Sequence, residues 1–198
     1  MLTSALSLCL AALAASAPLT ILPRETCYSG VYVIGARGSD EDPGYGSVAS
    51  VVSGVLSAIP NSGAIALDYP ASILDPLYDG SVTDGINAMI SLIENYVNSC
   101  GGEIVLVGFS QGGNVITDVL AGGVDKPTPL EPSYASYRAF FSYKMLEKDE
   151  ETDTSRLPVS AVTVFGDPTF THGQSFDAGT DTTTNGVSRP LYRTYSST

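Results

Sequence analysis

The sequence predicts an α/β fold in which a parallel sheet is flanked by helices. Short apolar segments rich in strand-forming residues alternate along the chain with segments whose apolar residues follow helical spacing. One segment, residues 104–109, is apolar throughout, as expected for a strand buried on both faces of a parallel sheet. The 198 residues are 43% hydrophobic and 15% charged, which fits one folded domain and excludes a disordered chain.

The first half of the chain supplies two expected strands and two expected helices. Residues 31–36 form a strand that runs into a loop at Arg37-Gly38-Ser39. Apolar residues between 48 and 59 follow a helical period, and Pro60 closes it. Residues 64–67 form a second short strand. The apolar residues between 82 and 97 then lie on one face of a second helix.

The second half is expected to continue the alternation. Residues 104–109 form a strand, 114–121 a helix and 159–165 another strand. Two regions do not fit this pattern. Residues 133–153 are aromatic and then highly charged, which indicates a solvated surface excursion, either a helix or a loop. Residues 173–198 are rich in Gly, Ser, Thr and Asp without a clear period.

Residues 1–17 are predicted to be a secretory signal peptide. They carry no charged side chain, and a Leu- and Ala-rich run ends at the small residues Ala15-Ser16-Ala17. The run is too short to span a membrane as a stable helix, and no other segment is long and apolar enough. The alternative is an N-terminal core helix. We therefore expect a secreted, extracellular protein whose folded domain occupies residues 18–198.

The cysteine count predicts one disulfide. Loss of the signal peptide removes Cys9 and leaves Cys27 and Cys100, an even pair in an oxidising compartment. We predict that these two residues bond, the alternative being two free buried cysteines. The bond would close a loop of 73 positions, which stabilises the fold by about 4 kcal/mol in the chain-entropy treatment, less any strain.

Charge and residue counts exclude several classes of function. The chain has 21 acidic and 9 basic side chains, a net charge of −12, which argues against binding to a nucleic-acid backbone. A single histidine excludes a zinc site built from several histidines. The chain also has neither the glycine fingerprint of a dinucleotide binder nor a phosphate-binding loop.

The motif most informative about chemistry is Gly108-Phe109-Ser110-Gln111-Gly112. It lies between an expected strand and an expected helix, where a sharp turn would lift the serine hydroxyl out of the sheet as a nucleophile. The flanking glycines permit that turn, and the helix start directs N–H groups toward developing negative charge. The alternative is a structural Gly-Ser turn.

Further motifs in the same order show that the sequence resembles the fungal cutinase and acetylxylan esterase family. They are Ala36-Arg37-Gly38-Ser39, Tyr69-Pro70-Ala71, Cys100 just before a strand, and Val164-Phe165-Gly166-Asp167-Pro168. Together they cover most of residues 27–179. The second and last of these motifs are more similar to the acetylxylan esterase branch than to true cutinases.

The resemblance implies a small, lidless α/β-hydrolase with one disulfide, Cys27 to Cys100. It implies Ser110 as nucleophile, and an oxyanion hole from Ser39 and from the backbone N–H of Gln111; without the resemblance Ser39 could be an ordinary loop serine. It implies no metal and no organic cofactor. The expected substrate is an extracellular ester, acetylated xylan being the first candidate and cutin or short lipid esters the second. We expect the protein to be a monomer that binds neither nucleic acid nor membranes.

The general base is not assigned to the single histidine. Asp167 and His172 follow Ser110 in the order of an α/β-hydrolase triad, but they lie only five positions apart. In the family pattern, the Gly-Asp-Pro segment precedes the catalytic acid and base. Asp177 and Asp181 are interpreted as surface carboxylates. The chain ends about where the family's acid-bearing loop should begin, so we expect it to be C-terminally incomplete.

Two hypotheses about function are compatible with these residues. In the first, the protein is a secreted serine esterase represented by a shortened chain. In the second, it is a short protein without a working triad that acts, if at all, as a carbohydrate-binding or interaction module. The chain as written is expected to hydrolyse p-nitrophenyl acetate weakly or not at all.

Overall fold

A computed structural model describes residues 26–131, 158–173, 177, 179 and 183–187. The expected signal peptide and the charged segment 133–153 lie outside these residues. The described part contains every strand and helix that the sequence predicts.

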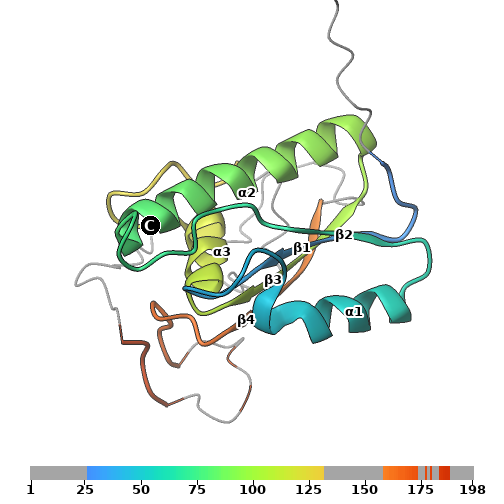
Figure 1. Ribbon diagram of the computed structural model, residues 1–198. Coiled ribbons are helices and arrows are strands. Elements are labelled where there is room, and N and C mark those ends of the chain that lie inside the picture. Colours follow the sequence, from blue (N-terminus) through green and yellow to red (C-terminus); the bar gives the residue numbers. More distant parts are fainter. Residues whose placement is uncertain (1–25, 132–157, 174–176, 178, 180–182, 188–198) are drawn as a thin grey trace, which may run out of the picture.

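The strands form one parallel sheet with the order β2-β1-β3-β4 (Figure 1). Their bounds are Val31–Ala36 for β1, Gly63–Ala66 for β2, Glu103–Phe109 for β3 and Val159–Phe165 for β4. β3 lies in the interior of the sheet, and five of its seven residues are buried. The apolar run 104–109 thus lies in a strand covered on both faces, as its composition predicts.

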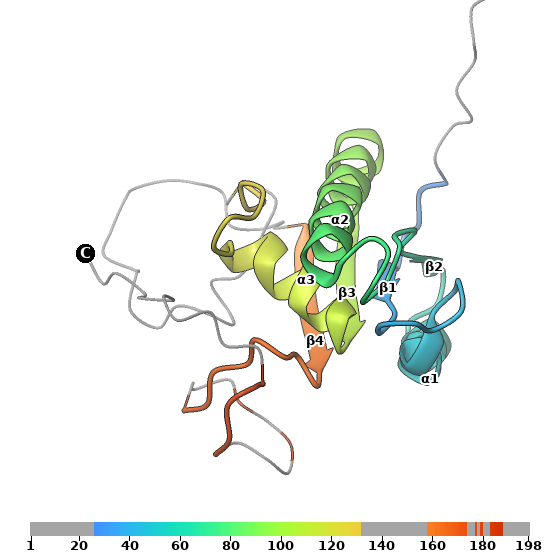
Figure 2. The same ribbon diagram turned by 60° about the vertical axis from the view of Figure 1, so that its left-hand side comes forward.

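Helices cover both faces of the sheet, as predicted (Figure 2). α1 (Ala49–Ala58), entered through the short 3-10 helix η1 (Gly46–Val48), packs on one face. α2 (Tyr78–Cys100) and α3 (Gln111–Ala121) pack on the other. Successive strand residues alternate between the two sides: Val31 and Val33 face α1, whereas Tyr32 and Ile34 face α2 and α3.

The direction of each crossover explains which face each helix covers. The chain moves from β1 outward to β2, and then crosses back past β1 to β3 and on to β4. Right-handed crossovers that run in opposite directions along a sheet place their helices on opposite faces. α1 therefore lies alone, while α2 and α3 pack against each other. No helix in the described residues is long and apolar enough to span a membrane.

Element bounds differ from the predicted ones mainly at helix ends. α3 begins at Gln111, three positions before the predicted start at 114, because Gly112 and Gly113 are helical despite their low propensity. α2 ends at Cys100, and the next residue, Gly101, has a φ of 64°, the left-handed conformation that favours glycine after a helix.

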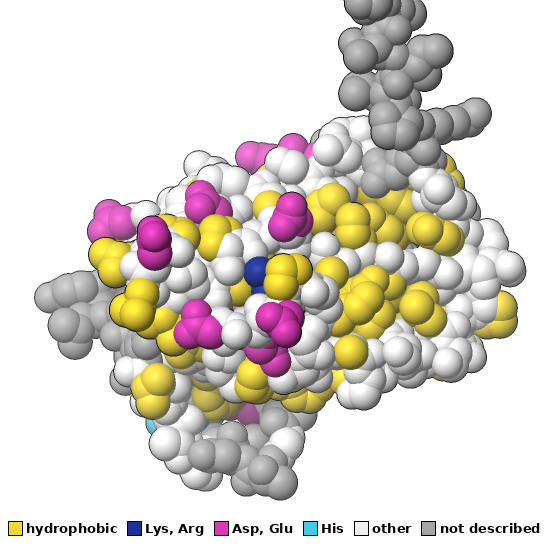
Figure 3. Space-filling model, in the orientation of Figure 1, with side chains coloured by type: hydrophobic (Ala, Val, Ile, Leu, Met, Phe, Trp, Pro, Cys, Tyr) yellow, Lys and Arg dark blue, Asp and Glu magenta, His cyan; other side chains and the backbone are white. Residues whose placement is uncertain are grey.

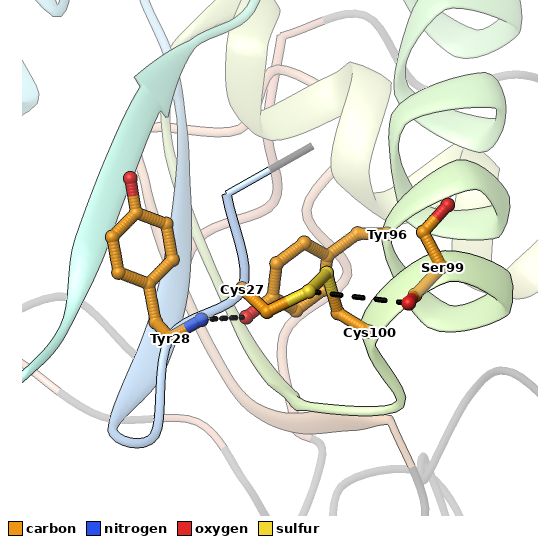
Figure 4. Close-up of a disulfide and its surroundings, with 5 residues drawn as sticks. All are labelled: Cys27, Tyr28, Tyr96, Ser99 and Cys100. Carbon is orange, nitrogen blue, oxygen red and sulfur yellow. Dashed lines mark hydrogen bonds between the residues drawn. A yellow bond between two sulfur atoms is a disulfide. The ribbon is translucent and has the colours of Figure 1, made fainter. Parts of the chain in front are cut away.

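The predicted disulfide between Cys27 and Cys100 is present, with Cα atoms 5.3 Å apart (Figure 4). It joins the segment before β1 to the last residue of α2. Beside it, the Tyr28 backbone N–H donates to the Tyr96 hydroxyl at 3.2 Å. Tyr96 is fully buried and stacks on Tyr32, with ring centroids 4.2 Å apart. The bridge therefore anchors the chain at the end of the core.

Candidate active site

The predicted site residues lie at the point in the sheet where the order of the strands along the chain reverses. β1 and β3 are neighbours, and Ala36 at the end of β1 pairs with Gly108 near the end of β3. From these two strands the chain proceeds in opposite directions, so their carboxyl ends form the topological switch point at which α/β folds bind ligands. Ser39 follows β1 and Ser110 follows β3. The topology thus brings the two predicted oxyanion loops to the same edge.

Ser110 occupies a sharp turn between β3 and α3. Its φ of 51° and ψ of −115° lie near the first central position of a type II′ turn, a conformation that favours glycine. Its backbone N–H donates to the Phe165 carbonyl at 2.8 Å, which fixes the turn to the end of β4. The residue is half-buried, and its hydroxyl makes no hydrogen bond to any other residue that the structure describes.

Close packing explains the glycines on either side of this serine. A Cβ on Gly108 would lie 2.7 Å from the Gly112 carbonyl oxygen. A Cβ on Gly112 would collide with the carbonyl oxygen of Ala36, at the end of β1. The first turn of α3 therefore packs directly on the β1 end, and that contact brings the start of α3 close to the loop that carries Ser39.

A buried arginine fixes the loop after β1. Arg37 is only 5% exposed, and its Nη2 donates to the Tyr69 carbonyl at 2.6 Å. The Tyr69 hydroxyl donates in return to the Arg37 carbonyl, also at 2.6 Å. Burial raises the pKa of Tyr69, and the Arg37 charge lowers it by less, so the phenol stays a neutral donor at ordinary pH. This reciprocal pair locks the loops after β1 and β2 together beside Ser39.

Glu41 closes the same loop from the solvent side. One carboxylate oxygen accepts the Gly38 N–H at 2.6 Å, and the other accepts the Ser47 N–H at 3.0 Å together with the Ser47 hydroxyl. Partial burial raises the pKa of Glu41, but the hydrogen bonds from Ser47 and Gly38 and the charge of Arg37 outweigh it, so the pKa lies below its ordinary value.

Asp167 makes contacts that hold secondary structure elements together. Its carboxylate accepts the Thr117 hydroxyl of α3 at 2.6 Å and both the N–H and the hydroxyl of Thr169 at 2.7 Å. The His172 side chain is exposed, and the residue is held through its backbone N–H, which donates to Asn185 at 3.0 Å. Within the described residues, Asp167 and His172 do not hydrogen-bond to each other or to the Ser110 hydroxyl.

A second polar chain braces α3 against the start of α2. The Tyr78 hydroxyl donates to Asn114 Oδ1 at 3.1 Å, and Asn114 Nδ2 donates to the buried carboxylate of Asp118 at 2.8 Å. Burial, followed by the charge of Asp167, raises the pKa of Tyr78. Asn114 is one turn beyond Ser110 and its N–H donates to the Ser110 carbonyl, so this chain stabilises the first turn of α3.

The surface around the site combines an acidic character with an exposed apolar loop. Acidic side chains are scattered over the face shown in Figure 3, with little Lys or Arg among them. Between β2 and α2, Ile73, Leu74 and Leu77 are 46%, 80% and 69% exposed. No group of three or more His, Cys, Asp or Glu in the described residues is arranged to hold a metal ion.

Sequence reasoning missed the residues that hold the predicted ones in place. Arg37 and Tyr69 appeared only as parts of motifs, and Ser81 was not singled out at all. Ser81 is fully buried, and its hydroxyl donates at 2.8 Å to the side chain of Gln111. The available signal was a small polar residue beside the apolar face of α2, which is a weak one.

Comparison with known proteins gives consistent relatives. The cutinase family model matches residues 27–190. The chain is 36% identical to acetylxylan esterase 2 of Talaromyces purpureogenus over 174 residues, covering 84% of this chain and 68% of that protein. It is 34% identical to cutinase 11 of Verticillium dahliae over 196 residues, covering 96% of this chain and 61% of the relative.

Solved structures agree with these sequence relatives. A crystal structure of an acetylxylan esterase at 0.90 Å resolution superposes with a TM-score of 0.65 at 33% identity, covering 84% of this chain and 76% of that one. The catalytic core of acetyl xylan esterase from Trichoderma reesei gives a TM-score of 0.61 at 29% identity, covering 83% and 76%. The small α/β-hydrolase fold predicted from the sequence is thereby confirmed.

Proposed function

This chain belongs to the cutinase family, and on that premise we propose that the protein is a secreted carboxylic-ester hydrolase that acts by serine acyl transfer. Ser110 is the proposed nucleophile. The hydroxyl of Ser39 and the backbone N–H of Gln111 are the proposed oxyanion donors. The observation that carries the proposal is the turn at Ser110, a glycine-favouring conformation occupied by a serine between β3 and α3.

The surrounding contacts support these roles. The sharp turn between β3 and α3 puts Ser110 at the carboxyl end of an interior strand, beside the loop that carries Ser39. Gln111 is the first residue of α3, and the first N–H groups of a helix have no partner within it. Such free donors stabilise negative charge that develops on a carbonyl oxygen.

The proposed reaction has two acyl-transfer steps. Ser110 Oγ attacks the ester carbonyl carbon and loses its proton to a base, while the carbonyl oxygen becomes an oxyanion held by Ser39 and Gln111. Collapse expels the alcohol, which takes up a proton, and leaves an acyl-serine ester. Water then attacks that ester, releases the acid and restores the hydroxyl. We do not assign the orienting acid to Asp167, because its carboxylate is bound by Thr117 and Thr169. We do not assign the base to His172, because its side chain is exposed and makes no hydrogen bond to Ser110 or Asp167.

The proposed substrates are neutral extracellular esters. The relatives include proteins named acetylxylan esterase and one named cutinase, so acetyl groups on xylan are the first candidate and cutin-type esters the second. A net charge of −12 disfavours polyanionic substrates. The exposed apolar side chains of the loop before α2 offer contact to an acyl chain or a polymer surface.

The test compares ester hydrolysis by the wild type and by Ser110→Ala, with Ser57→Ala on the exposed face of α1 as control. The rates measured are p-nitrophenyl acetate hydrolysis and acetate release from acetylated xylan. Because no base is assigned, we expect a low wild-type rate, which Ser110→Ala lowers to that of the uncatalysed reaction and Ser57→Ala leaves unchanged. Equal rates in the wild type and Ser110→Ala would refute the nucleophile. Binding to xylan without acetate release would instead support the carbohydrate-binding alternative.

The same assay decides the part of the single histidine. We expect His172→Ala to retain the wild-type rate, because the His172 side chain is exposed and makes no hydrogen bond to Ser110 or to Asp167. A rate abolished by His172→Ala in a folded protein would assign the base to His172 and overturn our exclusion of it.

A further inference from the structure

Three segments meet at the side chain of Gln111, the residue that follows the proposed nucleophile. Ser81 Oγ of α2 donates to Gln111 Oε1 at 2.8 Å. Gln111 Nε2 donates to the Ser72 carbonyl, in the loop after β2, at 2.9 Å. The Ser72 backbone N–H donates to Ser81 Oγ at 3.0 Å. The three residues therefore form a closed ring of hydrogen bonds, which we call the Gln111 tether.

The tether is shielded from water. Gln111 and Ser81 are both 0% exposed, so no solvent is available to replace a lost partner. The Ser81 hydroxyl both accepts and donates within the ring. Its removal would leave two groups without a bond: the N–H of the half-buried Ser72 and the buried Gln111 amide oxygen. Ser81 takes part in two of the three bonds of the ring, and its loss leaves Gln111 held only by the bond to the Ser72 carbonyl.

The tether acts on the orientation of the backbone at the start of α3. Gln111 directly follows the strained Ser110, and its own N–H is the donor assigned above to the oxyanion. A side chain fixed to two other segments restricts the rotation of its own peptide unit, so the N–H keeps one direction. An oxyanion donor contributes most when it is oriented before the charge develops.

We propose that Ser81 is a positioning residue for the oxyanion hole: through the Gln111 side chain, it holds the Gln111 backbone N–H in its productive direction. This inference rests on the proposed function. Ser81 touches no reacting atom and acts through Gln111 alone. The loop side of the ring is fixed as well, because Ser72 Oγ accepts the N–H groups of Leu74 and Asp75 at 3.2 Å and 2.9 Å.

The test uses Ser81→Ala, with Ser91→Ala as the matched control. Ser91 is on the same helix but is exposed, and its hydroxyl donates to the Asn87 carbonyl of its own helix. We expect Ser81→Ala to lower kcat for p-nitrophenyl acetate about tenfold to a hundredfold, with KM changed less than about twofold, as for a donor displaced rather than removed. We expect Ser91→Ala to match the wild type. Where Ser81→Ala does not fold, Ser81→Cys keeps the side-chain size and donates weakly.

A double-variant cycle separates positioning from general destabilisation. Gln111→Met retains the backbone N–H but breaks the ring. If Ser81 acts through Gln111, the kcat of the combined Ser81→Ala and Gln111→Met variant equals that of Gln111→Met alone. Effects on kcat that multiply, or a Ser81→Ala kcat equal to that of the control, would overturn the proposal.

Amide hydrogen exchange measured by NMR tests the tether without reference to turnover. We expect the backbone and side-chain amide protons of Gln111 to exchange faster in Ser81→Ala than in Ser91→Ala. In a wild type whose turnover is too slow for kcat to be measured, amide exchange alone decides the tether. Faster exchange in Ser81→Ala would support it, and unchanged exchange would overturn it.

Discussion

Replacing Ser110 with glycine should stabilise the folded protein while removing the proposed nucleophile. A serine at φ 51° and ψ −115° holds its Cβ in a conformation that only glycine adopts readily. Among the described residues, the hydroxyl of Ser110 has no hydrogen-bond partner whose loss would offset the relief. The rest of the fold must therefore supply the energy that keeps Ser110 in this turn.

The expected size of the effect is the difference of two terms. Strain at such a residue is about 1–3 kcal/mol, and glycine costs about 0.5–1 kcal/mol through the greater freedom of the unfolded chain. The free energy of unfolding of Ser110→Gly should therefore exceed that of Ser110→Ala by about 1 kcal/mol, because alanine keeps the Cβ. For a domain of this size that is about 2–4 °C in the midpoint of thermal unfolding.

Urea unfolding followed by far-ultraviolet circular dichroism and by tyrosine fluorescence measures this difference. The chain has 11 tyrosines and no tryptophan, so the tyrosine signal is undisturbed. The two variants should share one slope with urea and differ in their midpoints. A Ser110→Gly variant that is no more stable than Ser110→Ala would refute the assignment of strain to this turn.

Three further perturbations test the parts that hold the site in place. Replacing both Cys27 and Cys100 by serine should lower the free energy of unfolding by about 4 kcal/mol, measured in urea against the oxidised wild type, because the bridge closes a loop of 73 residues. Gly112→Ala should destabilise by about 1–3 kcal/mol, since its Cβ would collide with the Ala36 carbonyl, whereas Gly54→Ala in α1, which has open space around it, should stabilise slightly. Folding lowers the pKa of Glu41, so the ionised carboxylate stabilises the folded protein above the ordinary pKa of 4.5, and this stabilisation is lost as pH falls through the folded pKa. Glu41→Gln should therefore flatten this part of the curve of unfolding free energy against pH. An unchanged slope would contradict the hydrogen bonds from Ser47 and Gly38 to Glu41.

The sheet and its helices follow from local patterns, and the sequence predicted them closely. Residues 31–36 and 159–165 form the strands β1 and β4 with the predicted bounds. The early start of α3 was missed because glycine has low helix propensity. The glycine at position 112 is explained by its contact with the Ala36 carbonyl, which joins two segments far apart in the sequence.

The candidate site was predictable where its chemistry lies in one short motif. The turn at Ser110 was expected from the residues around it, and the structure shows the strand and helix that the motif requires. The contacts of Arg37, Ser81 and Asp167 were not predictable, because each joins elements that only the folded chain brings together. Asp167 and His172 follow Ser110 in the order of a triad, but their separation of only five positions argued against that role, and in the structure the Asp167 carboxylate bonds to Thr117 and Thr169.

Covalent labelling of Ser110 tests the central claim most directly. An organophosphate ester such as diethyl p-nitrophenyl phosphate forms a stable bond with an activated serine, so the label accumulates even where turnover is slow. After prolonged incubation and peptide mass spectrometry, we predict one diethylphosphoryl group on the peptide that contains Ser110, and none on that peptide in Ser110→Ala. An unlabelled wild type, or a label on another residue that persists in Ser110→Ala, would contradict the assignment of Ser110 as the nucleophile.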